Sequence, residues 1–339
     1  MSKVKSYLSL IKFSHTIFAM PFAMIGFFLG LAKLFGSEEE SSGVGQWNLN
    51  KTVGWGVEND PETLFSSDSL MSQLITAENP PILVAKYFLL VVLCMVFARS
   101  AAMSFNRYLD RSFDAKNPRT AIREIPAGIL KANSVLLFTI INCLLFITCT
   151  FFINRLCLFL SPIALLVVLG YSYTKRFTPL CHLVLGVGLS LAPIGAYLAV
   201  TGVFNWLPLL FSFTVIFWVS GFDIIYALQD EEFDKSQKLY SMPAWLGKAK
   251  ALRVSEFLHL CSATCVCIAG WYGHFGWLYW IGVAFFIVML GYQHAIVKPN
   301  DLRRVNLAFM TTNGIASVVF AIFVIADLFI NQHSSGGIQ

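Results

Sequence analysis

Long apolar runs separated by short polar segments dominate the chain. Each run holds about 20 residues, the length that an α-helix needs to cross the hydrocarbon core of a bilayer. Nine such runs occur, at about 13–34, 83–105, 134–153, 156–173, 183–204, 207–228, 254–272, 277–297 and 305–330. Because a helix satisfies its own backbone hydrogen bonds in lipid, the pattern predicts an all-α membrane protein with nine transmembrane helices in one bundle.

Composition supports this prediction. Hydrophobic residues make up 57% of the 339 residues and charged residues 13%, whereas an average soluble domain is about 45–50% apolar and 25% charged. This excludes a soluble globular enzyme and a disordered chain. The eight cysteines lie mostly in apolar runs without zinc-site spacing, which excludes a disulfide-built secreted domain. The chain has no basic tract, so we expect membrane lipid and no nucleic acid as a partner.

The distribution of basic residues orients the bundle. Nineteen of the 24 Lys and Arg residues lie in the N-terminal segment or in the loops after the second, fourth, sixth and eighth helices. The positive-inside rule therefore predicts a cytoplasmic N-terminus and, with nine spans, an external C-terminus in a cell inner membrane. We expect residues 1–339 to form one transmembrane domain. Residues 36–82, with eight acids and one base, are an external acidic insert between the first two helices.

Two acidic clusters stand at the inner ends of the second and sixth helices. The first contains Asn106, Asp110 and Asp114, and the second contains Asp223, Tyr226, Asp230 and Asp234. On uninterrupted helices, such spacings place each set on one face. Ionised carboxylates repel one another, and an Asp near the bilayer centre costs about 2.5–3.5 kcal/mol. We therefore expect a cation between the clusters, and Mg²⁺ is the hard cation that carboxylates and phosphate hold together. The alternative is two solvated helix ends.

The two clusters are also similar to each other. Asp110 and Asp114 recur as Asp230 and Asp234 at an offset of 120 residues, with Phe before the second Asp in both. Each pair closes the second helix of a four-helix set. The chain is thus predicted to contain two related halves and a ninth helix, with both acidic faces meeting in a central cavity open to the cytoplasmic side.

Basic residues follow the same helices. Arg119 and Arg123 lie in the loop after the second helix, and Lys175 and Arg176 follow the fourth. Cations beside metal-binding acids are typical of a diphosphate site, because Arg forms paired hydrogen bonds to phosphate and Lys supplies a point charge. For any one of these four basic residues, the alternative explanation of its position is the general positive-inside bias of membrane proteins. Arg99 lies within a membrane helix, seven residues before Asn106, where an ionisable residue is a functional candidate.

These motifs resemble the UbiA-type intramembrane aromatic prenyltransferase family. Its patterns N-x-x-x-D-x-x-x-D and D-x-x-x-D match 106–114 and 230–234, its Y-x-x-x-K element matches Tyr171 to Lys175, and its R-T-x-x-R-x-x-P-x-G run resembles 119–128. The resemblance covers about 5–35 and 83–330. Arg107 departs from it, because many relatives have Asp at that place. The sequence near 13–16, 21–23 and 105–107 is similar to that of a branch of the family associated with the futalosine route to menaquinone.

The resemblance implies a Mg²⁺-dependent enzyme. The enzyme would transfer a polyprenyl group from polyprenyl diphosphate to the ring of a hydroxylated aromatic acid, such as 4-hydroxybenzoate, in ubiquinone or menaquinone biosynthesis. A dihydroxynaphthoate-type acid is the alternative acceptor, and a membrane transporter is the alternative from another class. Asp110, Asp114, Asp230 and Asp234 would hold the metal. The catalytic residues would be Asp223, Lys175 and Arg176, and the substrate-binding residues Asn106, Arg119, Arg123, Tyr171, Tyr226 and Arg99.

The topology is testable. In a cysteine-depleted background, a single cysteine introduced as Ser66→Cys should react with a membrane-impermeant thiol reagent added to spheroplasts, because the insert is expected to be external. A cysteine introduced as Ser236→Cys, after the sixth helix, is the matched control and should react only after lysis. The opposite pattern at the two positions would contradict the orientation.

Overall fold

The computed structural model describes residues 3–11, 18–40, 70–74 and 77–334. Every regular element in these ranges is helical. The α-helices are α1 (Lys3–Leu10), α2 (Met20–Glu40), α4 (Leu70–Leu74), α5 (Pro80–Leu109), α6 (Arg111–Asp114), α7 (Ala132–Phe151), α8 (Arg155–Thr174), α9 (Cys181–Thr201), α10 (Trp206–Ala227), α11 (Glu231–Ser236), α12 (Met242–Leu246), α13 (Lys248–Tyr272), α14 (Trp277–Ile296) and α15 (Asn313–Ser334). A 3₁₀ turn, η2 (Leu228–Asp230), follows α10, and a π-helical turn, η3 (Leu307–Thr312), precedes α15.

Eight helical segments are long and apolar enough to cross a membrane. They are α5, α7, α8, α9, α10 with its continuation to Ser236, α13, α14, and η3 with α15. The apolar part of α2, Met20–Lys33, is shorter. Their outward faces carry large exposed apolar side chains such as Leu166 (73% exposed) and Trp271 (76%), and an apolar surface of this kind is suited to lipid. The prediction of an all-helical membrane bundle is confirmed.

Local sequence sets several helix ends. Pro80 and Pro81 begin α5, where a missing N–H leaves no helical hydrogen bond unmade. The Asn154 side chain caps α8 by accepting a hydrogen bond from the Cys157 backbone N–H at 2.8 Å, and Asn205 caps α10 in the same way. Gly202, at φ +71°, ends α9 in the left-handed conformation that glycine adopts most easily.

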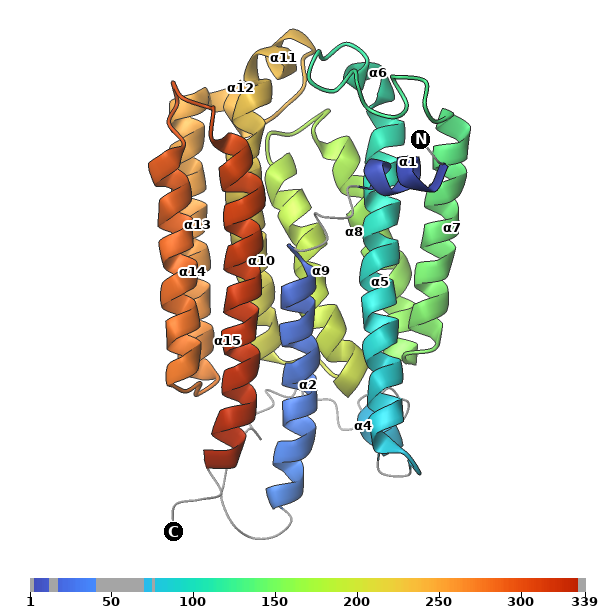
Figure 1. Ribbon diagram of the computed structural model, residues 1–339, viewed down its shortest axis with the longest axis vertical. Helices are drawn as coiled ribbons and strands as arrows, with labels where there is room; N and C mark the ends of the chain where they lie inside the picture. The colour runs from blue at the N-terminus through green and yellow to red at the C-terminus, as the bar shows by residue number, and fades with distance from the viewer. Residues whose placement is uncertain (1–2, 12–17, 41–69, 75–76, 335–339) are drawn as a thin grey trace.

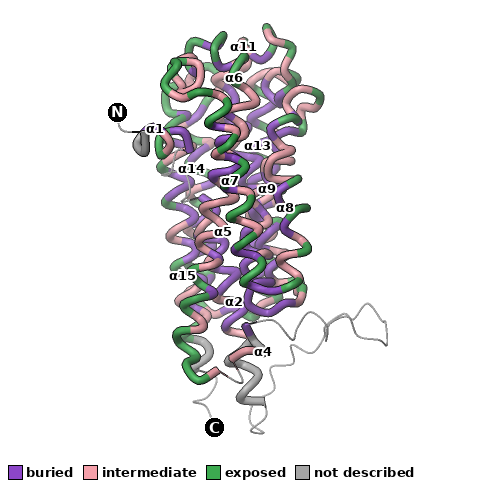
Figure 2. The backbone as a smooth tube through the Cα atoms, turned by 90° about the vertical axis from the view of Figure 1, so that its right-hand side faces the viewer, coloured by how far each residue is buried: buried purple, intermediate pink, exposed green. Residues whose placement is uncertain are grey.

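The long helices run roughly parallel to one axis (Figure 1). The short helices α6, α11 and α12 close one end of the bundle, the short helix α4 lies toward the opposite end, and α15 runs from the first end toward the second. Helix α1 lies toward the same end as α6, where the Ser9 hydroxyl donates to the Glu124 carboxylate at 2.6 Å. In the view turned by 90°, the buried residues lie mainly between the outer helices (Figure 2). The polar loops therefore meet at a single end of an apolar bundle.

Small residues bring α2, α9 and α10 close together. A Cβ atom at Gly26 in α2 would overlap the carbonyl oxygen of Pro193 in α9, and Gly186 in α9 similarly faces the backbone of Ile216 in α10. Close backbone approach at small residues is a common way to pack helices in lipid, where apolar burial alone gives no preference for protein over lipid. This packing brings the first turn of α9 against the last turns of α10.

Both acidic motifs lie at helix breaks. Helix α5 ends at Leu109, Asp110 has φ −88° and ψ 5°, and α6 begins at Arg111. Helix α10 likewise ends at Ala227, and η2 precedes α11. Asp favours helix ends, where its side chain competes for backbone hydrogen bonds, over helix interiors. In the first motif, Asn106 and Asp110 still share a face at this break, because the Asn106 amide donates to the Asp110 carboxylate at 3.2 Å.

Candidate active site

A cavity of about 280 Å³ opens between the helices near the end that carries α6 and α11. Its walls come from α5, α6, the loop that follows α6, the end of α8, the start of α9, α10, η2 and η3. Twelve of the predicted site residues line it: Arg99, Asn106, Asp110, Asp114, Arg119, Arg123, Tyr171, Lys175, Arg176, Asp223, Tyr226 and Asp230. Asp234 is the exception, because it is fully buried behind the side chain of Lys175.

Each of the four predicted metal-binding acids is paired with a basic residue. The shortest N–O distances are 2.5 Å for Arg119–Asp230, 2.6 Å for Arg123–Asp114, 2.7 Å for Lys175–Asp234 and 3.3 Å for Arg176–Asp110. The predicted phosphate-binding cations already balance these acids.

The ion pairs cross between the two acidic motifs. The loop after α6 places Arg123 on Asp114 nearby and sends Arg119 across to Asp230. The turn after α8 does the same, because Arg176 pairs with Asp110 while Lys175 pairs with Asp234. Each basic segment thus contacts an acid from both motifs, and the pairs join the two halves of the bundle at the cavity.

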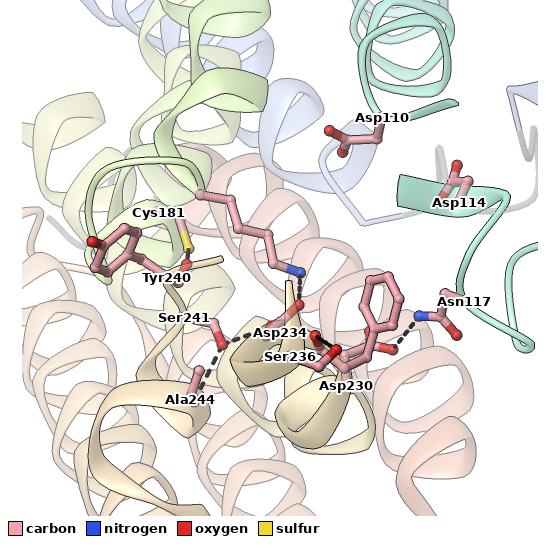
Figure 3. A network of polar contacts seen from close by, with 12 residues as sticks. Asp110, Asp114, Asn117, Cys181, Asp230, Asp234, Ser236, Tyr240, Ser241 and Ala244 are labelled. Atoms are coloured by element: carbon pink, nitrogen blue, oxygen red, sulfur yellow. Dashed lines mark hydrogen bonds and ion pairs between the residues drawn. The ribbon is translucent and has the colours of Figure 1, made fainter. Parts of the chain in front are cut away.

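Two neutral side chains that sequence reasoning missed complete this end. In Figure 3, Asp110 and Asp114 lie on one side and Asp230 and Asp234 on the other, with the Asn117 amide donating to Asp230 at 3.2 Å. The Ser241 hydroxyl donates to Asp234 at 2.8 Å and accepts from the Ala244 backbone N–H, so it also caps α12. No spacing distinguishes Asn117 or Ser241 in the sequence, because both act through contacts with residues of other elements.

The pKa shifts follow from burial and these pairings. Burial and the neighbouring Asp114 carboxylate raise the pKa of Asp110, although Arg176 and Lys175 oppose the shift. Burial by itself would lower the pKa of Lys175, but the Asp234 carboxylate outweighs it and raises that pKa. The same balance, with Asp230 as the partner, raises the pKa of Arg119. Lys175 and Arg119 therefore stay cationic at neutral pH.

Asp223 is held by a histidine deeper in the cavity. Its Oδ2 lies 2.7 Å from Nδ1 of the buried His182 at the start of α9. Nε2 of His182 accepts a hydrogen bond from the Met242 backbone N–H at 3.3 Å, so the ring proton is on Nδ1 and is donated to Asp223. No motif marks His182 in the sequence, so only the structure shows its contact with Asp223. It fixes the orientation of Asp223.

One wall of the cavity is aromatic. Tyr226 packs against Phe309 with ring centroids 4.3 Å apart, and Phe309 also contacts Phe18 and Phe222. The Tyr226 hydroxyl accepts a hydrogen bond from Arg119 Nη1 at 3.0 Å. Tyr226 therefore joins the aromatic wall to the charged residues, and Asp223 lies about one turn earlier on α10.

A second cavity of about 360 Å³ adjoins the first. It lies between α5, α7, α8 and α9, and its lining is almost entirely apolar. Arg99 and Tyr171 line both cavities. Among the described residues, the buried Nε atom of Arg99 has no hydrogen-bond partner, and the same holds for Nε of Arg107, which lines the first cavity. A buried cation with an unused donor beside an open cavity is suited to an anionic group.

The acids fit Mg²⁺ in their chemistry. Carboxylate oxygens are the ligands that Mg²⁺ prefers, and the buried Oδ2 of Asp114 has no hydrogen-bond partner among the described residues. Across those same residues, no three His, Cys, Asp or Glu side chains converge as a ready metal site, because each acid is turned toward its basic partner. Most of the predicted external insert, 36–82, lies outside the described residues.

Comparison with known proteins assigns this arrangement to a class, the intramembrane prenyltransferases. Residues 69–315 match the profile of the UbiA prenyltransferase family. The chain is 31% identical over 242 residues to the 4-hydroxybenzoate octaprenyltransferase of Tolumonas auensis, which covers 70% of this chain and 83% of that protein. A protein of the same name from Cupriavidus pinatubonensis is 29% identical over 243 residues, covering 68% of this chain and 83% of that protein.

Solved structures share the fold. A UbiA homolog from Aeropyrum pernix K1 superposes with a TM-score of 0.67 at 23% identity, covering 94% of this chain and 98% of that one. A homolog from Archaeoglobus fulgidus bound to GPP and Mg²⁺ gives 0.64 at 17% identity, covering 96% and 99%. The protein described here belongs to the UbiA prenyltransferase family. It is a multi-pass membrane enzyme, which removes the transporter alternative.

The role of His182 can be tested by substitution. His182→Leu removes the donor to Asp223 and should lower prenyl transfer by roughly 10–100-fold, since an unpaired buried polar group costs about 1–3 kcal/mol. His182→Asn keeps a side-chain N–H donor and should retain more activity than His182→Leu. The matched control His274→Asn changes an exposed histidine in the α13–α14 loop and should have no effect. Equal losses in the two His182 variants would contradict an orienting hydrogen bond.

Proposed function

We propose that this protein transfers a polyprenyl group from polyprenyl diphosphate to the ring of a hydroxylated aromatic acid, such as 4-hydroxybenzoate. The reaction depends on Mg²⁺ and serves ubiquinone or menaquinone biosynthesis. The observation that carries the proposal is a single cavity lined by three acid–base pairs and by Lys175 of the fourth, by an aromatic wall and by Asp223. The names of the curated relatives support the acceptor class.

The charged residues bind the diphosphate. Arg119, Arg123, Lys175 and Arg176 supply positive charge to phosphate oxygens, and Asp110, Asp114, Asp230 and Asp234 supply the metal ligands. When bound there, Mg²⁺ offsets negative charge on the departing diphosphate. The acids that would hold Mg²⁺ are the partners of these bases, so a base whose acid held the metal would be free to contact phosphate. The Arg119–Asp230 and Lys175–Asp234 pairs lie at hydrogen-bonding distance, which holds Arg119, Asp230 and Lys175 in place at the cavity.

The aromatic wall and the second cavity receive the apolar groups. The polyprenyl tail lies in the 360 Å³ cavity, whose apolar lining runs along α5 and α8 toward lipid. The acceptor ring packs near Tyr226, and the uncompensated guanidinium of Arg99 binds its carboxylate. Asn106 and Tyr171 line the space between the reactants. These apolar walls keep water from the allylic carbon, which water would otherwise capture.

Asp223 acts on the acceptor. In the reaction, the C–O bond between the allylic carbon and the diphosphate breaks, and that carbon bonds to the ring carbon ortho to the hydroxyl. The displaced ring proton passes to the Asp223 carboxylate, which the N–H of His182 keeps oriented toward the cavity. Lys175 and Arg176 neutralise the leaving diphosphate and in this sense are catalytic.

The membrane arrangement belongs to the same proposal. Counting α2 as a span gives nine helices in two related halves plus α15, within one domain over 1–339. The cavity opens to the cytoplasm of a cell inner membrane, with the N-terminus inside, the C-terminus outside and the 36–82 insert external. The basic loops support this orientation, because those that bear Arg119, Arg123, Lys175 and Arg176 all lie at the cavity end.

Removal of the metal should abolish turnover. In excess chelator, the purified protein should neither release diphosphate nor form product, because the acids lose the cation that lets their basic partners turn to phosphate. Added Mg²⁺ should restore both. Diphosphate release and prenylated acid are measured together from a labelled polyprenyl diphosphate. Full activity in chelator would contradict the proposed metal dependence.

The two kinds of aspartate should be separable. Asp230→Asn should abolish both binding of a non-hydrolysable diphosphate analogue and product formation. Asp223→Asn should leave Mg²⁺-dependent analogue binding intact but slow transfer by about 10²–10³-fold, a typical loss for one catalytic contact. Binding isotherms and steady-state rates are compared, with Asp301→Asn, in the α14–η3 loop, as the matched control. If Asp223→Asn loses analogue binding as fully as Asp230→Asn does, Asp223 belongs to the metal site.

A further inference from the structure

The last membrane helix begins with an irregular turn at the cavity. Residues 307–312 form the π-helical turn η3, and Phe309 within it lines the 280 Å³ cavity. A π-turn holds an extra residue relative to an α-helix, shifts the side chains before it around the helix axis, and often occurs at functional sites. The turn therefore decides where Phe309 faces.

The side chain of Asn313 fixes this turn. It is fully buried, and its Nδ2 donates to the carbonyl oxygens of Ala308 at 3.2 Å and Phe309 at 3.0 Å. Its Oδ1 accepts from Trp218 Nε1 at 3.0 Å and Gln293 Nε2 at 2.7 Å. An Asn side chain has two donors and two acceptor positions, and all are used. The turn is thus tied to α10 through Trp218 and to α14 through Gln293.

Phe309 forms part of the aromatic wall of the cavity. Its ring packs on Tyr226 at a tilt of 32°, and it meets Phe18 and Phe222 edge to face at 5.4 Å each. Tyr226 is hydrogen-bonded to Arg119, which is paired with Asp230. Phe309 therefore contacts the residue that joins the aromatic wall to the charged residues, and its ring takes space that a longer acceptor would need.

We propose that Phe309 determines which acceptors the enzyme accepts by limiting the length of the aromatic ring system, and that Asn313 is a positioning residue that sets Phe309 in place. The proposal rests on the proposed function. With Phe309 in position the cavity takes a monocyclic hydroxylated acid, and a smaller side chain there opens it to a fused bicyclic acid.

The test compares acceptors in one assay. For the unaltered protein and its variants, kcat/KM is measured with 4-hydroxybenzoate and with a dihydroxynaphthoate, using the same polyprenyl diphosphate. Phe309→Leu should raise the naphthoate-to-benzoate ratio by about 10-fold or more, the usual range for a change of pocket size. The KM for polyprenyl diphosphate should be unchanged. Phe329→Leu, on the same helix and 45% exposed, is the matched control and should leave the ratio unchanged.

Asn313→Asp tests the positioning role. This substitution keeps the shape of the side chain but removes both N–H donors, so the π-turn loses the hydrogen bonds to the carbonyl oxygens of Ala308 and Phe309. The naphthoate-to-benzoate ratio of kcat/KM should then shift in the same direction as in Phe309→Leu. An active Phe309→Leu variant with an unchanged ratio, or an equal shift in Phe329→Leu, overturns the inference alone. If the unaltered protein prenylates neither acid, the proposed function fails, and this inference fails with it.

Discussion

Four ion pairs, two of which cross between the acidic motifs, hold the site together. Charges at the edge of an apolar bundle are stable only when they are paired, because removing either partner leaves the other buried without compensation. Here Arg119 and Lys175 each reach the acid of the other motif, while Arg123 and Arg176 stay with the nearer one. The same pairs that neutralise the acids therefore fix the two halves of the bundle relative to each other around the cavity.

This pairing also shapes the chemistry. A site with acids alone would repel the diphosphate, and a site with bases alone would not hold a metal. The cavity holds acids and bases that balance each other, so it carries groups suited to a metal and groups suited to phosphate. Asp110, whose pKa is raised by burial and by Asp114, has the longest pair, at 3.3 Å to Arg176. It is the acid whose basic partner is held least closely.

One cavity combines three kinds of surface. Charged side chains lie near α6 and α11, Asp223 is hydrogen-bonded to His182, and Tyr226 packs against Phe309. The adjoining apolar cavity has Arg99 and Tyr171 in common with the first. Together these surfaces suit the proposed substrates, which have an anionic head, an apolar tail and an aromatic reaction partner.

The amino-acid sequence by itself determined the membrane class and most of the site. Apolar runs of helical length can be stable only as spanning helices. Two matched acidic motifs with basic loops leave few places for charge other than a shared polar cavity, so Asp110, Asp230, Arg119 and Lys175 could be assigned to one site. Tertiary structure alone decided which base pairs with which acid. It also decided that the helices break at Asp110 and at Leu228, that His182 orients Asp223, and that Asn313 turns Phe309 toward Tyr226. The His182–Asp223, Trp218–Asn313 and Arg119–Asp230 contacts join residues from about 40 to more than 100 positions apart. Such contacts depend on how closely α2, α9 and α10 approach one another and on the rotation of each helix about its axis. The packing of whole helix faces sets the approach and the rotation, so no local pattern in the sequence encodes these contacts.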